Sequence, residues 1–158
     1  MKRKIILIAG EDGYDEAAHI PHFVISESYG KGIYAAGGIP VLALDFRTIR
    51  EYVELADGLL LTQGPIIHPA RYGQIFESSR ELEGFVASRD SMDFLLCKAF
   101  LDAGKPVMGI GRGAKVIHLV ASEEQKRLTV GIRCENEKLE TAEYYQKFMD
   151  LCVKEEER

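Results

Sequence analysis

A glycine-rich turn carries the clearest chemical pattern in the sequence. Gly109-Ile110-Gly111-Arg112-Gly113 ends the apolar run 106–110 and precedes a helical pattern over residues 114–121. When a Ser or Cys holds the central position of such a strand-to-helix turn, the turn is a nucleophile elbow, which presents that side chain above the sheet in a strained conformation. The central residue here is Gly111, which has no side chain and can attack nothing.

The same turn suits a second kind of chemistry, the binding of an anion. The N–H groups that begin the following helix have no intrahelical partners, and Arg112 and Gly113 lie beside them, which favours a carboxylate or phosphate ligand. The spacing Gly109-x-Gly111-x-x-Ala114 also matches a dinucleotide fingerprint. That fingerprint belongs after the first strand of a fold and needs an acidic partner. We therefore predict no cofactor.

Two other groups of residues are weaker candidates. An N/O metal site is one interpretation of the polar segment after the first apolar run, which contains Glu11, Asp12, Asp15, Glu16, His19 and His22. The spacing of the two histidines alone does not specify a metal, and we predict none. The cysteines Cys97, Cys134 and Cys152 have neither a disulfide pattern nor zinc-ligand spacing. Cys97 falls among apolar residues, where a buried thiol is the default, and a substitute nucleophile among the three stays an alternative.

Apolar runs and helical patterns alternate along the chain. Strands are predicted at residues 5–8, 39–44, 59–62 and 106–110, with a fifth candidate at 128–132; helices are predicted at 23–36, 47–56, 83–103 and 114–121, with a last one at 139–153. This alternation predicts an α/β fold, a reduced flavodoxin-like three-layer sandwich with a mostly parallel sheet of four or five strands.

Ligands of such folds bind beyond the carboxyl ends of the strands. The segments after Ala9, Thr62 and Ile110 should therefore share one edge of the sheet, where we expect any site. The longest loop, residues 63–80, begins at this edge. It contains His68, which could contact a ligand there, although an ordinary exposed loop histidine is the alternative.

Several motifs occur in the order typical of a known family. They are Tyr34-Ala35-Ala36-Gly37-Gly38-Ile39-Pro40-Val41, Asp57-Gly58-Leu59-Leu60-Leu61, Pro69, Tyr72-Gly73, Arg89-Asp90 and the run from Lys105 to Gly113. In this order they resemble class I glutamine amidotransferase-like proteins, specifically the γ-glutamyl-γ-aminobutyrate hydrolase branch, which reads D-G-L-L-L-P-G-G, then R-D, then K-P-V-L-G-I-C-R-G-x-Q. The resemblance covers about residues 1–121 of a single domain, 1–158, with a shortened and divergent part over 122–158.

The departures from this family fall on its catalytic residues. The resemblance implies a nucleophilic Cys at Gly111, a Gln at Lys115, and a Pro-Gly-Gly that helps form the oxyanion hole where this chain has Thr62-Gln63-Gly64. The His-Pro-Glu-like motif that supplies the family's catalytic His and Glu does not occur, and the part after residue 121 is too short for the family's remaining strands. Losing one member of a comparable triad costs roughly 10⁴–10⁶ in rate. We expect the family's hydrolase reaction to be lost.

Composition limits the partners. A chain of 158 residues fits one domain, and a net charge of −5 argues against nucleic acid as the main partner. No stretch approaches the roughly 20 apolar residues of a membrane span, and the apolar run after the basic residues 2–4 is too short for a signal peptide. We therefore predict a cytoplasmic protein with neither a nucleic-acid nor a membrane partner.

The sequence thus favours a catalytically inactive homologue of a γ-glutamyl hydrolase or glutamine amidotransferase that binds a small anionic or γ-glutamyl ligand or a protein partner. Its candidate ligand-binding residues are Gln63, Gly64, His68, Gly111, Arg112 and Gly113. The alternative is an enzyme of altered chemistry, a hydrolase acting on small γ-glutamyl or other carboxylate-bearing compounds, with the turn as anion cradle and His68 or an acidic residue as base. Because a shortened sheet exposes an edge, we also expect a homodimer or a complex with another protein.

Overall fold

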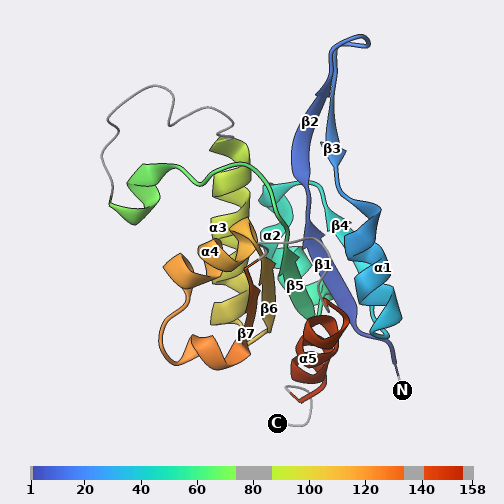
Figure 1. The fold of residues 1–158 in the computed structure, drawn as a ribbon, viewed down its shortest axis with the longest axis vertical. Coiled ribbons are helices and arrows are strands. Elements are labelled where there is room, and N and C mark those ends of the chain that lie inside the picture. Colours follow the sequence, from blue (N-terminus) through green and yellow to red (C-terminus); the bar gives the residue numbers. More distant parts are fainter. Residues whose placement is uncertain (1, 74–86, 134–140, 155–158) are drawn as a thin grey trace.

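The protein is described by a computed structural model over residues 2–73, 87–133 and 141–154, and within these residues five apolar strands form one parallel sheet (Figure 1). The strands are β1 (Ile5–Ala9), β4 (Ile39–Ala43), β5 (Gly58–Leu61), β6 (Val107–Ile110) and β7 (Thr129–Ile132), and their spatial order is β4-β1-β5-β6-β7. Every neighbouring pair is parallel. Numbered within this sheet alone, the order is 2-1-3-4-5, the flavodoxin-like arrangement. The predicted fold class is confirmed.

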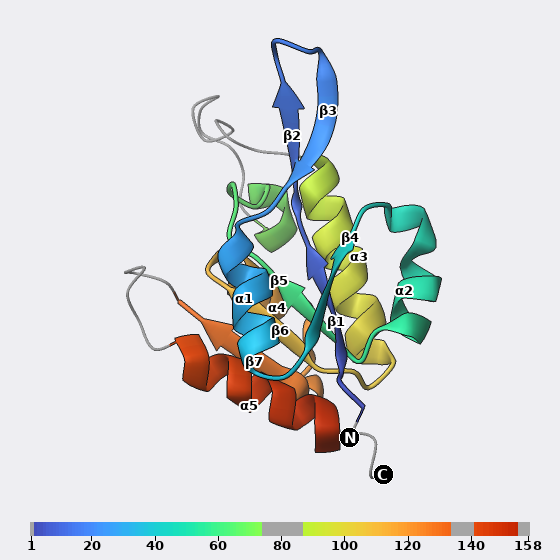
Figure 2. The ribbon, with the colours of Figure 1, turned by 90° about the vertical axis from the view of Figure 1, so that its right-hand side faces the viewer.

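Helices cover both faces of the sheet (Figure 2). One face packs against α1 (Glu27–Ala35) and α5 (Thr141–Lys154), and the other against α2 (Ile49–Leu55), α3 (Ala87–Asp102) and α4 (Arg112–Val120). Alternate residues of each strand enter the two cores. Ile6 packs on the side of α5 with Phe148, whereas Leu7 packs on the side of α3 with Phe100, and all four are completely buried. Burial on both faces explains the unbroken apolar runs in the sequence.

The main correction to the predicted elements concerns residues 11–24. They form an antiparallel hairpin of β2 (Glu11–Asp15) and β3 (Ile20–Val24), where we predicted a polar loop and the start of a helix at residue 23. The Asp15 carboxylate accepts hydrogen bonds from the N–H groups of Ala17 and Ala18, both at 2.9 Å, which builds the turn. The helix begins later because the side chain of Ser26 caps it by accepting from the N–H of Ser28.

The other elements lie close to their predicted positions. The helices predicted at 47–56, 114–121 and 139–153 are observed as a 3-10 turn (Phe46–Thr48) followed by α2, as α4 and as α5, and the candidate strand at 128–132 is β7. The helix predicted at 83–103 is α3; residues 83–86, and residues 139–140 of the last predicted helix, lie outside the described residues. The described part of the long loop, up to residue 73, contains a 3-10 helix (Pro69–Tyr72), and another (Gln125–Leu128) precedes β7. In the described residues, no helix has the length and apolar character needed to cross a membrane.

Candidate functional site

The turn between β6 and α4 keeps the geometry of a nucleophile elbow although it carries no nucleophile. Gly111 has φ 56° and ψ −110° and caps the N-terminus of α4. A Cβ at Gly109 would lie 2.4 Å from the carbonyl carbon of Gly113, and a Cβ at Gly113 would lie 2.2 Å from the carbonyl oxygen of Leu61. These two glycines are therefore required by contacts between backbones. The positive φ of the central glycine is a conformation that L side chains rarely adopt.

The side chain of Gln63 fills the space above this elbow. A Cβ built at Gly111 would lie 2.7 Å from Oε1 and 2.9 Å from Cδ of Gln63, which follows β5 by two residues. The three nearest side-chain or backbone atoms among the described residues, apart from the chain neighbours of Gly111, all belong to this flexible and exposed side chain. The backbone N–H of Gln63 donates to the hydroxyl of Tyr29 at 3.2 Å, so a residue of α1 also reaches this edge of the sheet. We refer to Gln63, Gly64, Gly111 and the first turn of α4 as the elbow edge.

A buried ion-pair cluster of Arg89, Asp90, Asp93 and Arg112 lies beneath the elbow edge. The Nε of Arg89 is 2.8 Å from Oδ2 of Asp93, and Nη2 of Arg112 is 2.5 Å from Oδ1 of Asp90. Arg112 Nη1 also donates to Asp93. All four side chains are at most 5% exposed. Two guanidinium groups and two carboxylates balance in charge, which is the condition for keeping ions inside a protein.

This cluster fixes the segment after β5 relative to the elbow. Arg89 Nη2 donates to the hydroxyl of Thr62 at 2.9 Å and to the carbonyl oxygen of Gln63 at 3.1 Å. Asp90 accepts the backbone N–H of His68 at 2.9 Å. A Cβ at Gly64 would lie 2.9 Å from Nη1 of Arg89, so this glycine permits the close approach of the guanidinium. The six candidate residues therefore belong to one connected region, held from below by α3.

Two of those candidates are turned away from the role that we predicted for them. The guanidinium of Arg112 points into the ion-pair cluster and not toward the elbow edge. The Nδ1 atom of His68 accepts the N–H of Ala70 at 3.2 Å and so caps the 3-10 helix that follows. Both side chains hold the site together in this structure. Their direct contact with a ligand stays a prediction.

The same 3-10 helix is anchored by two cation–π contacts. The ammonium of Lys115, in the first turn of α4, lies 4.3 Å from the ring centre of Tyr72, and the guanidinium carbon of Arg71 lies 4.8 Å from that of Phe94 on α3. The resemblance places a Gln at position 115. Here the Lys at that position contacts an aromatic ring of the neighbouring loop, which helps keep this loop beside the elbow.

The thiols of the described residues are not activated nucleophiles. Cys97 on α3 is completely buried and Cys152 on α5 is 3% exposed. Burial raises the pKa of each thiol to about 12, so both are protonated at neutral pH, and a nucleophilic Cys needs the opposite shift. Burial also raises the pKa of Asp93, against the opposing effect of Arg89 and Arg112. Cys134 lies outside the described residues.

Of the polar segment named as a weak metal candidate, the structure describes the side chains of Asp15, Glu16, His19 and His22, whereas those of Glu11 and Asp12 lie outside the described residues. Among the described side chains, no three or more of His, Cys, Asp or Glu come together in a way that could hold a metal ion. His22 lies on the exposed strand β3 and His19 in the turn before it, with φ 55°. His118 is an exposed residue of α4.

Sequence reasoning missed Tyr29 and Asp93. The signal for Asp93 was available: Arg89, Asp93, Leu96 and Phe100 follow helical spacing, so the charged pair had to share the buried face of the two apolar residues. All four are at most 2% exposed. Charged residues on the apolar face of a helix imply buried partners. For Tyr29 no comparable signal exists, since its hydroxyl contact depends on how α1 sits on the sheet.

Comparison with known proteins places the sheet and the elbow within a known family. The family described as Peptidase C26 matches residues 5–146, which extends the resemblance beyond residue 121. A protein of Rickettsia prowazekii, provisionally named glutamine amidotransferase-like, is 32% identical over 106 residues, 65% of this chain and 37% of the relative. A protein of Mycobacterium tuberculosis, provisionally named a glutamine amidotransferase, is 32% identical over 63% of this chain and 33% of its own length. A protein of Schizosaccharomyces pombe with the same provisional name is 30% identical over 60% of this chain and 37% of its own length.

The aligned part of this chain thus spans about a third of the length of the curated relatives that it matches. The family match runs from β1 into α5 and so includes the whole central sheet, the elbow and the ion-pair cluster. The fold, the retained turn and this match together lead to one conclusion: the chain belongs to the Peptidase C26 family, a group with glutamine amidotransferase-like members.

Proposed function

We propose that this chain is a non-catalytic member of its family, related to the γ-glutamyl-γ-aminobutyrate hydrolase branch, and that it binds a small carboxylate-bearing or γ-glutamyl ligand at the elbow edge. One observation carries the proposal. The elbow keeps its turn at Gly111, yet the place of a nucleophilic side chain is taken by the amide of Gln63. The turn is preserved while the group that would perform the reaction is replaced by one that can only bind.

The elbow edge offers suitable groups for such a ligand. The Gln63 amide provides both a carbonyl acceptor and an NH₂ donor, which matches a carboxylate or a carboxamide. The N–H of Gly111 donates to the carbonyl oxygen of Ile132 at 2.8 Å. The N–H of Lys115 donates to the carbonyl oxygen of Gly111 at 3.3 Å, which is the first intrahelical hydrogen bond of α4. The N–H groups of residues 112–114 precede this first intrahelical bond and form the positive end of the helix dipole, where an anion is stabilised.

An enzyme of altered chemistry has less support. The thiols of Cys97 and Cys152 are buried and protonated, Arg112 is held by two carboxylates, and the Nδ1 atom of His68 already accepts a backbone N–H. A nucleophile paired with a base is the minimum for the family's kind of reaction. No such pair occurs at the elbow edge among the described residues.

The first experiment compares turnover by the native protein with turnover by Gly111→Cys on a panel of γ-glutamyl amides and glutamine. We expect no hydrolysis above the buffer rate by the native protein. Gly111→Cys tests whether the elbow alone restores any reaction, and Gly111→Ser in parallel shows whether a thiol is needed. Turnover by the native protein would refute the non-catalytic assignment.

A second experiment measures binding separately. Isothermal titration calorimetry with glutamate, glutamine and γ-glutamyl-γ-aminobutyrate tests the ligand class directly. Loss of the Gln63 side chain in Gln63→Ala should weaken the binding of a responding compound about tenfold, the value of one hydrogen bond to a charged group. Gln146→Ala on α5, which removes another exposed amide, should leave the affinity unchanged. If none of these compounds binds the native protein, the ligand part of the proposal fails.

A further inference from the structure

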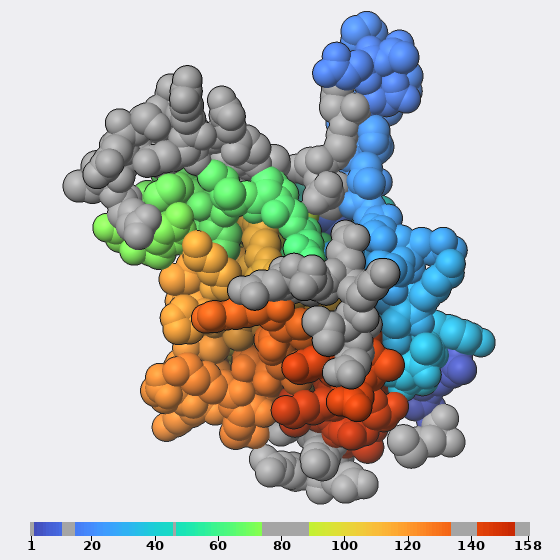
Figure 3. All heavy atoms as spheres, viewed as in Figure 1, coloured from blue at the N-terminus to red at the C-terminus, as the bar shows by residue number. Residues whose placement is uncertain are grey.

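The hairpin of β2 and β3, which we call the arm, projects from the body of the molecule. Figures 1 and 2 show it continuing beyond the sheet, and in the space-filling view of Figure 3 its described tip stands clear of the other segments. All five residues of β3 are exposed, including Ile20 at 56%, Phe23 at 37% and Val24 at 43%. A two-stranded hairpin is at best marginally stable by itself in water. An arm with exposed apolar residues therefore calls for a surface to pack on.

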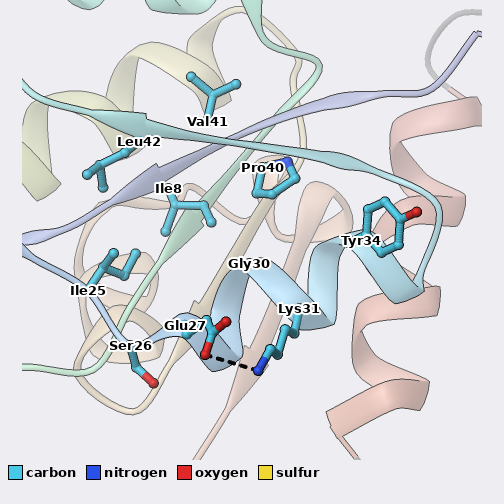
Figure 4. A pocket seen from close by; sticks show the side chains of 10 residues that line it. All are labelled: Ile8, Ile25, Ser26, Glu27, Gly30, Lys31, Tyr34, Pro40, Val41 and Leu42. Carbon is cyan, nitrogen blue, oxygen red and sulfur yellow. Dashed lines mark ion pairs between the residues drawn. The ribbon is translucent and has the colours of Figure 1, made fainter.

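A suitable surface lies at the side of the same molecule. An apolar groove of about 410 Å³ lies where α1 meets the edge strand β4 (Figure 4). Its lining consists of Ile8, Ile25, Ser26, Glu27, Gly30, Lys31, Tyr34, Pro40, Val41 and Leu42. The charged residues Glu27 and Lys31 pair with each other at 3.0 Å on the exposed rim, so the floor is left to aliphatic side chains.

The edge of β4 itself is poorly suited to the addition of another strand. The N–H of Ile39 donates to the carbonyl oxygen of Lys4, just before β1, at 2.7 Å. Because alternate residues of a strand point to opposite sides, the N–H groups at positions 42 and 44 point away from β1, as would one at position 40. Pro40 has no N–H, and that of Leu44 donates to the hydroxyl of Tyr52 at 3.0 Å. Of these three positions, Leu42 alone has an outward N–H that is neither missing nor bonded to Tyr52, so an added strand would find few donors. A partner is therefore expected to pack its side chains into the groove and not to extend the sheet.

The arm and the groove match in length. Strands of five residues, such as β3 and β4, are about 17 Å long. The nine residues of α1 span about 14 Å. The arm leads directly into the near end of the groove, because Ile25 and Ser26 follow β3 and precede α1. To lie over its own groove, the arm would have to reverse its direction at Gly10 and at residues 25–26, whereas the arm of a second copy can lie along the groove unbent.

The charges at the two ends are complementary. Asp15 and Glu16 are exposed at the tip of the arm. At the far end of the groove, Tyr34 is 61% exposed and the guanidinium of Arg3 lies 4.7 Å from the centre of its ring. Suppose that two copies lie antiparallel about a two-fold axis. The base of each arm is then next to the near end of the other copy's groove, and the acidic tip of each arm reaches Arg3 of the other copy. Both interactions then form twice, as a symmetric dimer requires.

We propose that a second copy of this chain occupies the groove: two copies exchange arms, and the β2–β3 hairpin of each packs between α1 and β4 of the other. Ile20, Phe23 and Val24 supply the apolar contacts, and Glu16 of each tip pairs with Arg3 of the other copy. This interface does not involve the elbow edge. It is independent of the ligand proposed there.

Charge reversal with rescue tests the pairing. The wild-type chain, Glu16→Lys, Arg3→Glu and the double variant are compared by light scattering coupled to gel filtration over a range of protein concentrations. Each single reversal places like charges together at both ends, so the dimer dissociation constant should rise more than about tenfold. The double variant, in which the charges are opposite again, should recover most of the affinity. Glu143→Lys, an exposed reversal on α5, should have no effect.

A crosslink gives a second, direct measurement. The first residue of β3, Ile20, lies at the arm tip, and Tyr34 lies near the C-terminal end of α1, which is the end farther from the arm. In a background with Cys134→Ser, the pair Ile20→Cys and Tyr34→Cys should form a disulfide only between copies, giving a dimer on a non-reducing gel that neither single variant gives. A wild-type chain that stays monomeric, a dimer insensitive to both reversals, or a double variant that fails to recover would each overturn the proposal.

Discussion

The side-chain amide of Gln63 lies over the backbone of Gly111, at the place where a side chain on residue 111 would begin. In the family pattern that the sequence resembles, position 63 is a glycine and position 111 is the nucleophile. This chain has the reverse arrangement, a long polar side chain at 63 and a glycine at 111. The side chain of Gln63 occupies the volume that a side chain at position 111 would need, so a residue at one position restricts the residue at the other.

This relationship predicts a coupling between the two positions. Gly111→Ala should lower the free energy of unfolding by about 1–3 kcal/mol, because its φ of 56° is strained for any residue with a Cβ and because the new methyl group displaces Gln63. In a Gln63→Ala background the steric part is absent and only the backbone strain remains. Urea unfolding of the four proteins measures the difference. Equal costs in both backgrounds would show that Gln63 moves aside freely and that the two positions are not coupled.

The ion-pair cluster predicts a large effect from one isosteric change. Asp93→Asn leaves Arg89 and Arg112 in a buried site with only one carboxylate, so the free energy of unfolding should fall by about 3–5 kcal/mol. Asp102→Asn provides the matched control on the same helix, since Asp102 pairs with Lys98 at the surface and should matter by less than about 1 kcal/mol. Denaturant unfolding of both variants tests this. Similar small losses in the two proteins would mean that the cluster contributes no more than a surface pair.

The sheet and its turn could be predicted from the sequence because their signals are local. Unbroken apolar runs identify strands buried on both faces, and G-x-G-x-G after such a run identifies a tight strand-to-helix turn. The role of Arg112 could not be predicted in this way. Its direction depends on the carboxylates of Asp90 and Asp93, which lie about twenty positions earlier in the chain and meet it only when α3 and α4 pack together.

The arm was missed for a different reason. Residues 20–24 contain Ile, Phe and Val, which favour a strand, but they also precede a real helix without a glycine or a long polar break. The boundary is set by hydrogen bonds of single side chains, those of Asp15 in the turn and Ser26 at the helix cap. Periodicity does not contain such information, and so the helix was extended backwards to residue 23.

Two cross-strand glycines should respond very differently to the same substitution. Gly109 of β6 pairs with Gly131 of β7. Gly109→Ala would place its Cβ 2.4 Å from the backbone of Gly113, which cannot move without distorting the elbow, so we expect a loss of at least about 3 kcal/mol in unfolding free energy. Among the described residues, a Cβ at Gly131 would meet the Cβ of Ala114, at an ordinary contact distance of 3.4 Å, and no backbone atom within 4 Å apart from those of its chain neighbours. Gly131→Ala should therefore change the stability by less than about 1 kcal/mol. Thermal and urea unfolding of the two variants test this contrast, and a tolerated Gly109→Ala would contradict the tight packing of the turn.

The buried thiols predict a loss of stability in alkali. The thiols of Cys97 and Cys152 have a pKa of about 12 in the folded chain, against 9.0 for an unperturbed thiol. The folded state therefore holds these two protons more tightly than the unfolded state does. Their contribution to stability is complete below pH 9 and declines as the pH rises from 9 toward 12, by up to about 1.4 kcal/mol per pH unit for each thiol.

Urea unfolding between pH 8 and 11, performed on the native chain and on Cys97→Ala, measures this contribution. The Ala variant should be less stable at pH 8, because it leaves a small cavity beside Phe100, but its stability should decline less steeply above pH 9. Other groups titrate in the same range, and the comparison of slopes removes what the two proteins share. The same burial predicts that both thiols react with Ellman's reagent at pH 8 only after urea is added, in a chain with Cys134→Ser. Parallel slopes, or fast reaction in the folded chain, would show that these thiols are not shielded by the two cores.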